Sequence, residues 1–257
     1  MTTFAFLHNY HTHTTYCRHA RNTVEEMIEM AIKNGYRTIG FSEHAPLKVH
    51  RNFRLNLHSW SDYIQEVNAL KKKYKGKIKV LCGLETEYHK SAFDYYQTLR
   101  KTKGIDYMIL GNHNEGDPHL AKEWNAQRVN LKQYGIQLVD GIKSGLFSAV
   151  AHPDYIFRYY PKWDQSCINL SKLIITTAQK YHIPLGFNLN GTLSKKTTMD
   201  YPVDQFWALV SRSKCSIIIE CDAHRKETLS RSVVNKGIKI INKWNLAHLL
   251  ITEMKLV

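Results

Sequence analysis

Four histidines lie within fourteen residues near the start of the chain, in the stretch LHNYHTHTTYCRHA at 7–20. They are His8, His11, His13 and His19. An H-x-H pair at the end of a strand can place two imidazoles on one metal ion. Side chains alternate along a strand, so we expect His11 and His13 on one face and His8 on the other. A lone H-x-H pair is common, so its meaning depends on further candidate ligands.

Further polar clusters occur along the chain, each directly after a short apolar run. They are SEH at 42–44, GLETE at 83–87, GNHNEGD at 111–117, AHPD at 151–154 and CDAH at 221–224. With the first stretch they supply seven histidines and two carboxylates as candidate metal ligands: His11, His13, His19, His44, Glu85, His113, His152, Asp222 and His224. One tetrahedral zinc takes about four ligands, so this set suits two or three ions with a bridging carboxylate. Nitrogen and oxygen donors without a thiolate indicate Zn, Mn or Fe in an open catalytic site.

Short runs rich in β-branched or aromatic residues alternate with longer segments of helical period, which predicts repeated βα units. Strands are expected near 4–10, 37–42, 78–86, 106–111, 147–151, 185–189, 216–221 and 247–252. Helices are expected after Thr23 and near 59–74, 91–102, 124–143, 166–181, 203–212 and 228–243. Thr23 and Glu26 fit a capping box at the start of the first helix, and Gly35 follows as its stop signal.

The number of these units predicts the architecture. Seven or eight βα units without a linker rich in Pro, Gly or Ser favour one closed α/β barrel over residues 1–257. An open, doubly wound sheet is the alternative. In a barrel the carboxyl ends of the strands share one rim, where active sites lie, so the polar clusters are expected to converge there.

Composition limits the possible partners. The chain has 257 residues, with 36 Lys plus Arg against 22 Asp plus Glu, a formal net charge of +14 that attracts phosphate esters or nucleic acid. The basic run KKKYKGKIK at 71–79 is interpreted as a solvated helix end.

Five cysteines without a C-x-x-C pair indicate free thiols. The chain shows no signal-peptide pattern and no long apolar run, so we expect a cytoplasmic protein that does not bind membranes.

The ordered series of motifs resembles the polymerase and histidinol phosphatase (PHP) superfamily, and more closely its histidinol-phosphate phosphatases. The resemblance runs from about residue 8 to about residue 250 through H-x-H, C-R-H-A, F-S-E-H-A-P, G-L-E, G-x-H, A-H-P-D and C-D-A-H. It implies a distorted, TIM-like (β/α)7 barrel with a trinuclear metal centre, and hydrolysis of L-histidinol phosphate to L-histidinol and phosphate in histidine biosynthesis.

The resemblance also implies how the nine candidates divide among the ions. His11, His13, Glu85 and Asp222 would hold one ion. Glu85 would bridge to a second ion held with His113 and His152, and the third would be held by His19, His44 and His224.

Three positions depart from the family pattern. Asn9 stands where the family usually has Asp, and we expect it at most to orient His11 through a hydrogen bond. Glu220 and Cys221 precede Asp222 where the family often has Gly and Ser, and alternation turns Glu220 into the barrel as a buried carboxylate unless the strand ends earlier. Gly186, in GFNLNG at 186–191, occupies the Glu position of an E-x-N stretch.

These residues suggest a hydrolytic mechanism. A hydroxide that bridges two ions would attack phosphorus, while Asp222 or His224, or a water that they hold, helps to protonate the leaving alkoxide. Arg158 is the candidate for binding the phosphate in a fork, and Glu115 and Asp117 are candidates for the ammonium or imidazole of the substrate.

Two other functions are compatible with the motifs. One is a PHP phosphoesterase or exonuclease that acts on nucleotides or nucleic acid, which the positive charge permits. A chain of 257 residues leaves no room for a separate nucleic-acid-binding module, so a small phosphate monoester is the expected partner. The other is a metal-dependent scaffold without catalysis, against which the complete set of nine ligand types argues.

Overall fold

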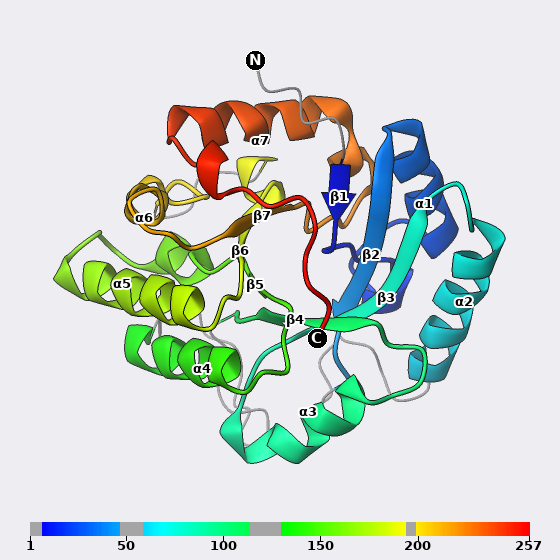
Figure 1. Ribbon diagram of the computed structural model, residues 1–257, viewed down its shortest axis with the longest axis horizontal. Coiled ribbons are helices and arrows are strands. Elements are labelled where there is room, and N and C mark those ends of the chain that lie inside the picture. The colour runs from blue at the N-terminus through cyan, green and yellow to red at the C-terminus, as the bar shows by residue number, and fades with distance from the viewer. Residues whose placement is uncertain (1–6, 47–58, 114–129, 194–198) are drawn as a thin grey trace.

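Seven parallel strands form the centre of the computed structural model, which describes residues 7–46, 59–113, 130–193 and 199–257. Each strand pairs with the next along the chain, in the order β1 to β7 (Figure 1). The strands are β1 (Leu7–Asn9), β2 (Tyr36–His44), β3 (Lys79–Thr86), β4 (Tyr107–Gly111), β5 (Ala149–Ala151), β6 (Leu185–Asn188) and β7 (Ile217–Glu220). Parallel pairing of consecutive strands in chain order is the arrangement of a TIM-like barrel.

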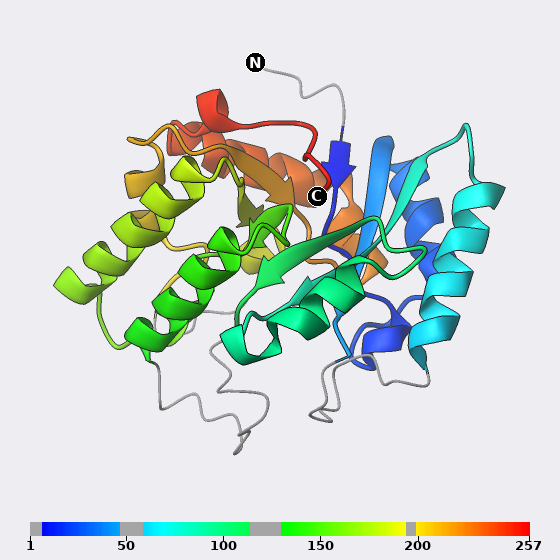
Figure 2. The ribbon, with the colours of Figure 1, turned by 60° about the horizontal axis from the view of Figure 1, so that its bottom comes forward.

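Helices follow the strands and lie outside the ring that the strands form (Figures 1 and 2). They are α1 (Val24–Lys33), α2 (Ser59–Lys73), α3 (Phe93–Arg100), α4 (Leu131–Lys143), α5 (Gln165–Lys180), α6 (Asp204–Val210) and α7 (Arg231–Lys243). None of the helices in the described ranges combines the length and the apolar character that a membrane crossing requires. The alternation of strands and helices confirms the predicted (β/α)7 architecture.

The seam between the first and last strands closes just beyond their carboxyl ends. Thr12 and Ala223 form a parallel bridge. The backbone N–H of His13 donates to the carbonyl of Ala223 at 2.9 Å, and the N–H of Ala223 donates to the carbonyl of His11 at 3.3 Å. The residues that close the barrel are therefore the neighbours of candidate ligands.

Helix α1 shows how local sequence sets an element. The Thr23 hydroxyl accepts a hydrogen bond from the backbone N–H of Glu26 at 3.3 Å, and the Glu26 carboxylate accepts one from the N–H of Thr23 at 2.9 Å. This is the predicted capping box. Gly35 follows the helix with φ +79°, a backbone conformation that glycine adopts without strain. Met27 and Ile28 bury the inner face of the helix.

Most predicted elements match the structure closely, and apart from one predicted strand the differences lie at their ends. Residues 124–129 of one predicted helix and residues 4–6 of the first predicted strand fall outside the described residues. The helices expected at 91–102 and 228–243 are preceded by separate 3-10 turns, Lys90–Ala92 and Lys226–Leu229.

The eighth strand predicted at 247–252 is wrong. Ala247–Leu249 forms a 3-10 helix, and only Leu250 bridges to Ile217. Because β1 and β7 already meet at the seam, the barrel has no gap for another full strand.

The C-terminal segment instead packs against the inside of the barrel. Figures 1 and 2 show this segment, in red, crossing the barrel opening. The N–H of Met254 donates to the Tyr10 hydroxyl at 3.3 Å. Met254 packs in an interior cluster with Tyr10, Leu81, Tyr107, Ile109, Ala149, Ala151 and Ile218. On β4 and β7, Ile109 is followed two residues later by Gly111, and Ile218 by Glu220. The barrel interior thus changes from apolar to polar toward the carboxyl rim.

Tyr107 connects β4 to β2 and to the residue that follows β1, so its replacement tests the architecture. Its buried hydroxyl lies 2.6 Å from the carbonyl of Tyr10 and 3.0 Å from that of Phe41. Tyr107→Phe leaves buried acceptors without that donor, so it should lower the free energy of unfolding by about 1–3 kcal/mol. Urea denaturation checks this, with Tyr181→Phe at a side chain that is 43% exposed as the control. Equal stability of the two variants would contradict the role of the Tyr107 hydroxyl.

Candidate metal centre

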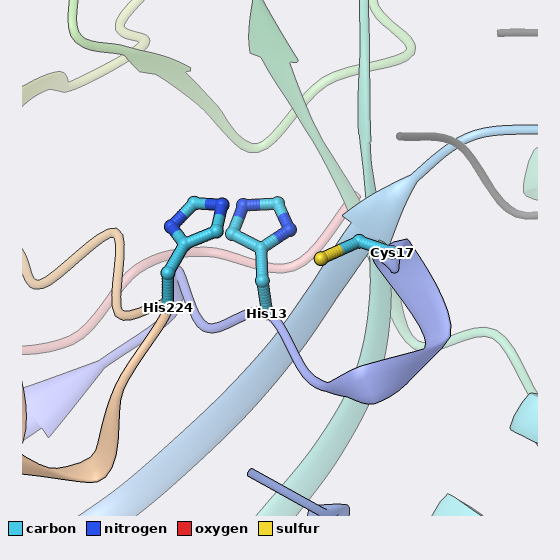
Figure 3. A group of neighbouring side chains, drawn as sticks. All are labelled: His13, Cys17 and His224. Atoms are coloured by element: carbon cyan, nitrogen blue, oxygen red, sulfur yellow. The ribbon is translucent and has the colours of Figure 1, made fainter. Parts of the chain in front are cut away.

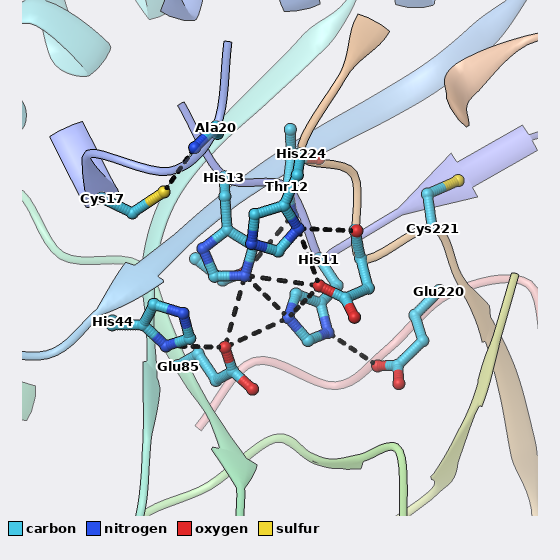
Figure 4. A network of polar contacts seen from close by, with 12 residues as sticks. His11, Thr12, His13, Cys17, Ala20, His44, Glu85, Glu220, Cys221 and His224 are labelled. Atoms are coloured by element: carbon cyan, nitrogen blue, oxygen red, sulfur yellow. Dashed lines mark hydrogen bonds and ion pairs between the residues drawn. The ribbon is translucent and has the colours of Figure 1, made fainter. Parts of the chain in front are cut away.

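All nine candidate ligands lie in the described part of the chain, at or just beyond the carboxyl ends of the strands. His44 ends β2, Glu85 lies near the end of β3, and His152 directly follows β5. The remaining candidates stand on the loops that leave β1, β4 and β7: His11, His13, His19, His113, Asp222 and His224. Figure 4 shows the rings of His11, His13 and His44 gathered around Glu85, with the ring of His224 stacked on that of His13. The convergence expected of a barrel rim is present.

The opening histidines separate as predicted, but for another reason. His11 Nε2 lies 3.1 Å from His13 Nε2, whereas His8 Nδ1 lies 3.0 Å from the hydroxyl of Thr38. However, β1 ends at Asn9, and Tyr10 packs in the interior cluster. The loop that follows the strand, and not strand alternation, therefore directs His11 and His13 toward each other.

The first candidate ligand group consists of His11, His13, Glu85 and Asp222. Glu85 Oε2 lies 3.3 Å from Nε2 of both His11 and His13. Asp222 Oδ1 lies 3.5 Å from His11 Nε2 and 3.6 Å from His13 Nε2. Four ligands about 2.0–2.1 Å from a zinc ion at tetrahedral angles lie roughly 3.3–3.4 Å from one another. The spacing of these donors therefore fits one divalent ion.

The second group uses the other oxygen of the same carboxylate. Glu85 Oε1 lies 2.7 Å from His152 Nε2 and 3.4 Å from His113 Nε2. A Cβ atom at Gly111 would lie 2.0 Å from this oxygen, so β4 must carry glycine where the Glu85 carboxylate lies. Glu87 contacts His113 Nδ1 at 3.0 Å and so orients the ring with its Nε2 toward Glu85. The two oxygens of Glu85 face different imidazoles, which is the arrangement of a bridging ligand.

The third group consists of His19, His44 and His224, whose ligand atoms lie within 4.8 Å of one another. His19 Nδ1 lies 2.9 Å from the carbonyl of Cys17, and His224 Nδ1 lies 3.1 Å from the carbonyl of Asp222. Each Nδ1 therefore donates its proton to a carbonyl, which leaves Nε2 as the lone-pair donor for a cation.

Cys17 is a neighbour of this centre that the sequence did not suggest. Its sulfur lies within 4.8 Å of ligand atoms of His13 and His224 (Figure 3). It accepts a hydrogen bond from the backbone N–H of Ala20 at 3.3 Å. Burial raises the pKa of the Cys17 thiol to about 12, so the thiol is neutral in the absence of a neighbouring cation.

Carboxylates and imidazoles shift one another's ionisation in the first group. Burial opposes protonation of His11, but the carboxylates of Glu85 and Asp222 raise its pKa well above the ordinary value. Burial also opposes protonation of His13, but the nearby carboxylates of Glu43 and Glu85 raise its pKa to about 9. Burial alone would raise the pKa of Glu85, but neighbouring imidazoles, His11 foremost, lower it well below its usual value.

The third group has the opposite electrostatics. Burial lowers the pKa of His44 well below its usual value, and it also lowers the pKa of His19. Burial and the nearby His13 together lower the pKa of His224 to about 3. These three rings are therefore neutral at physiological pH and ready to bind a cation without losing a proton.

Asn9 and Glu220 divide the role that was expected of Asn9 alone. The Asn9 side chain accepts from the backbone N–H of His11 at 3.3 Å and of Cys221 at 2.8 Å, and thus fastens the seam. The expected hydrogen bond exists, but it reaches the His11 backbone. The His11 ring instead contacts Glu220, with Nδ1 3.2 Å from Oε2. Glu220 is buried in the barrel, as alternation along its strand predicted.

Glu43 is a further site residue that the sequence did not single out. Its carboxylate accepts hydrogen bonds from the backbone N–H and the hydroxyl of Thr14, both at 2.6 Å. Its other oxygen lies 3.6 Å from His13 Nδ1. The only signal in the sequence was its place beside His44 in the SEH cluster.

A TIM-like barrel with clustered imidazoles and carboxylates at its carboxyl rim defines a metal-dependent enzyme. The model of the PHP domain family matches residues 9–188, so the chain belongs to that family.

The relatives of the chain carry one activity in their names. The histidinol-phosphatase of Bacillus subtilis is 34% identical over 247 residues, which cover 84% of this chain and 92% of the relative. A protein of Deinococcus radiodurans named "probable histidinol-phosphatase" is 25% identical over 84% of this chain and 85% of its own length. The crystal structure of the Lactococcus lactis histidinol phosphate phosphatase, complexed with zinc, L-histidinol and phosphate, has a TM-score of 0.71 and 20% identity, covering 96% of this chain and 98% of that one.

The contrast between the first and third groups predicts different pH dependences of metal binding. His11 and His13 must lose protons to bind an ion, so zinc affinity of the first group should rise from pH 6.5 toward pH 9, whereas that of the third group stays flat. In the metal-free protein the raised pKa of His13 stabilises the fold below pH 6.5, and this stabilisation is lost as the pH rises through about 9.

Calorimetric zinc titrations of His19→Ala, which retains the first group, and His11→Ala, which retains the third, measure the two dependences. Titration in two buffers of different ionisation enthalpy counts the protons released. A flat pH profile for His19→Ala would refute the assignment of protonated imidazoles to the first group.

Proposed function

We infer that this chain is a metal-dependent phosphatase that hydrolyses L-histidinol phosphate to L-histidinol and inorganic phosphate. The observation that carries this inference is the buried Glu85 carboxylate, whose two oxygens face separate sets of imidazoles. Such a shared carboxylate suits a centre of two or three divalent ions. The identity of the substrate is inferred from the names of the relatives and from the Lactococcus lactis enzyme. That enzyme binds zinc together with L-histidinol and phosphate, which are the two products of this reaction.

The donor set fits divalent transition-metal ions, and each group would hold one ion. His11, His13, Glu85 and Asp222 would hold the first, Glu85, His113 and His152 the second, and His19, His44 and His224 the third. Bound divalent ions lower the pKa of water toward neutrality and neutralise charge on phosphoryl oxygens. The chain itself contributes a rigid, buried frame that orients these donors.

Asp222 and His224 are the two candidates for handling the proton of the leaving alkoxide, and we propose that Asp222 does so through a water molecule that it holds. His224 has no ring nitrogen left for a water, because its Nδ1 donates to the Asp222 carbonyl and its Nε2 would bind the third ion. Burial and the neighbouring His13 lower the pKa of His224, so its ring is neutral. Burial alone would raise the pKa of Asp222, but the protonated imidazole of His11 holds it well below its usual value. Since neither group carries a spare proton, a water that donates a hydrogen bond to the Asp222 carboxylate is the better donor to the alkoxide.

Arg158 is the proposed ligand of the substrate phosphate. Its guanidinium carbon lies 4.9 Å from the ring centroid of Tyr201 and 5.2 Å from those of Tyr155 and Tyr159. Tyr155 in turn packs against His113 and His152, with ring centroids 5.2 and 5.3 Å apart. Among the described residues, Arg158 Nε is buried without a hydrogen-bond partner. These contacts support a cation held ready beside the second ligand group.

Other features of the enzyme are part of the same proposal. Glu115 and Asp117, the candidates for the amino or imidazole end of the substrate, lie outside the described residues and stay predictions. All five cysteines of the chain are buried and unpaired among the described residues, which supports a reducing, cytoplasmic environment. We propose that residues 1–257 work as one domain on a small phosphate ester.

Substrate preference tests the function. Protein loaded with Zn or Mn should turn over L-histidinol phosphate with a kcat/KM roughly 10²-fold or more above that for p-nitrophenyl phosphate, because a polar site discriminates against a substrate that lacks its hydrogen-bonding groups. A short single-stranded DNA should not be degraded at a comparable rate. Steady-state kinetics with the three substrates decide the matter, and a preference for DNA would favour the nuclease alternative.

Replacement of Arg158 tests the phosphate contact. A bond between charged groups contributes about 1.5–3 kcal/mol, so Arg158→Ala should raise KM for L-histidinol phosphate by roughly 10- to 150-fold. Arg158→Lys should recover only part of this loss because lysine lacks the planar fork. Metal content should stay unchanged, and Arg212→Ala, at an exposed arginine beyond α6, serves as the control. An unchanged KM for Arg158→Ala would exclude this contact.

A further inference from the structure

The Glu220 carboxylate fills the space inside the barrel that a side chain at position 186 would occupy. Gly186 lies on β6 beside β7, where it is paired with Ile218. A Cβ atom at Gly186 would lie 2.4 Å from the carboxyl carbon of Glu220 and 2.4 and 2.6 Å from its two oxygens. The backbone of Gly186 does not have a positive φ, so its conformation would accept a side chain. Glycine is therefore required at 186 because the carboxylate that reaches in from β7 fills the space.

The Glu220 carboxylate connects two ligand groups of the proposed metal centre. Its Oε2 lies 3.2 Å from His11 Nδ1 (Figure 4), and its Oε1 accepts a hydrogen bond of 2.6 Å from the backbone N–H of His152. Only 1% of the residue is exposed. Each carboxylate oxygen thus has its own partner, one in the first ligand group and one in the second.

The two partners need such support for different reasons. His11 offers Nε2 to the first group, and that atom carries a lone pair only when the ring proton lies on Nδ1, where Glu220 accepts it. His152 has φ +31°, a strained conformation for a residue other than glycine, and its N–H is held by the Glu220 carboxylate. A single carboxylate therefore fixes the tautomer of one ligand and the backbone of another.

We propose that Glu220 is the positioning residue of the metal centre, which sets His11 and His152 in place together, and that strand β6 could supply the same carboxylate from position 186. The proposal rests on the proposed metal centre, but it does not depend on the identity of the substrate. Zinc affinity measured without substrate therefore tests it independently of the phosphatase assignment.

The test uses four variants of the full chain: Glu220→Ala, Glu220→Gln, Gly186→Asp and the double variant Gly186→Asp with Glu220→Ala. Glu220→Gln keeps the packing, but only one of its amide atoms is an acceptor. If that oxygen stays on the His152 N–H, the NH₂ group faces His11 Nδ1 and favours the tautomer with the proton on Nε2. Aspartate at 186 is chosen because its carboxylate oxygens stand about as far from their own Cβ as the Glu220 oxygens lie from a Cβ placed on Gly186.

We expect both single replacements of Glu220 to lower zinc affinity by about 10- to 100-fold, with kcat reduced more than KM is raised. Gly186→Asp alone should also weaken zinc binding, because its side chain meets the Glu220 carboxylate. The double variant should recover at least about tenfold of the lost affinity, since one carboxylate again occupies the space.

Chelator competition measures zinc affinity, mass spectrometry measures the metal bound, and thermal unfolding in chelator shows that each variant is folded. Asp106→Asn is the matched control, because Asp106 also accepts a backbone N–H, that of Cys82, but lies before β4 at the opposite end of the barrel. Parental zinc affinity in folded Glu220→Gln would overturn the positioning role. A folded double variant without recovery would overturn the claim that position 186 can supply the same group.

Discussion

The burial of one carboxylate, that of Glu85, is the constraint on which the rest of the site depends. A buried negative charge is costly unless cations or donors surround it. Five imidazoles approach the two oxygens of Glu85 within 2.7–3.4 Å, and they come from the loops or ends of four other strands. The ring of parallel strands brings these segments together over one point, so the barrel supplies the imidazoles that the buried charge needs.

The apolar interior beneath the site makes this concentration of polar groups possible. The interior of the barrel is filled by Tyr107, Ile109 and Ile218. Two residues beyond Ile109 and Ile218, on the same faces of β4 and β7, lie Gly111 and Glu220 at the rim. Close packing there excludes water and fixes the strands, so the candidate ligands above start from rigid positions. The consequence of crowding is visible at Gly111, where no side chain fits beside Glu85.

Sequence patterns predicted those features that depend on local chemistry. The capping box at Thr23, the seven strands and the polar residues at their ends all follow from periodicity and spacing. The false eighth strand at 247–252 has strand-like composition, but whether it pairs is decided by closure of the seam at Thr12 and Ala223, which no local pattern reports. Cys17 and Glu43 were missed because their contacts with His13 depend on how loops fold over the rim.

In the sequence, Gly186 and Glu220 are two separate departures from the family pattern. In the structure the two residues are neighbours, and the side chain of one fills the space left by the other. A glycine on β6 removes a side chain, and a glutamate on β7 places its carboxylate where that side chain would begin. The requirement set by the site is an acceptor for His11 Nδ1 and for the His152 N–H, and it does not specify the strand that supplies it. Neighbouring parallel strands can therefore exchange such a group, provided that the partner position becomes small at the same time. A motif judged position by position would count both residues as defects, whereas the geometry of the pair accounts for both.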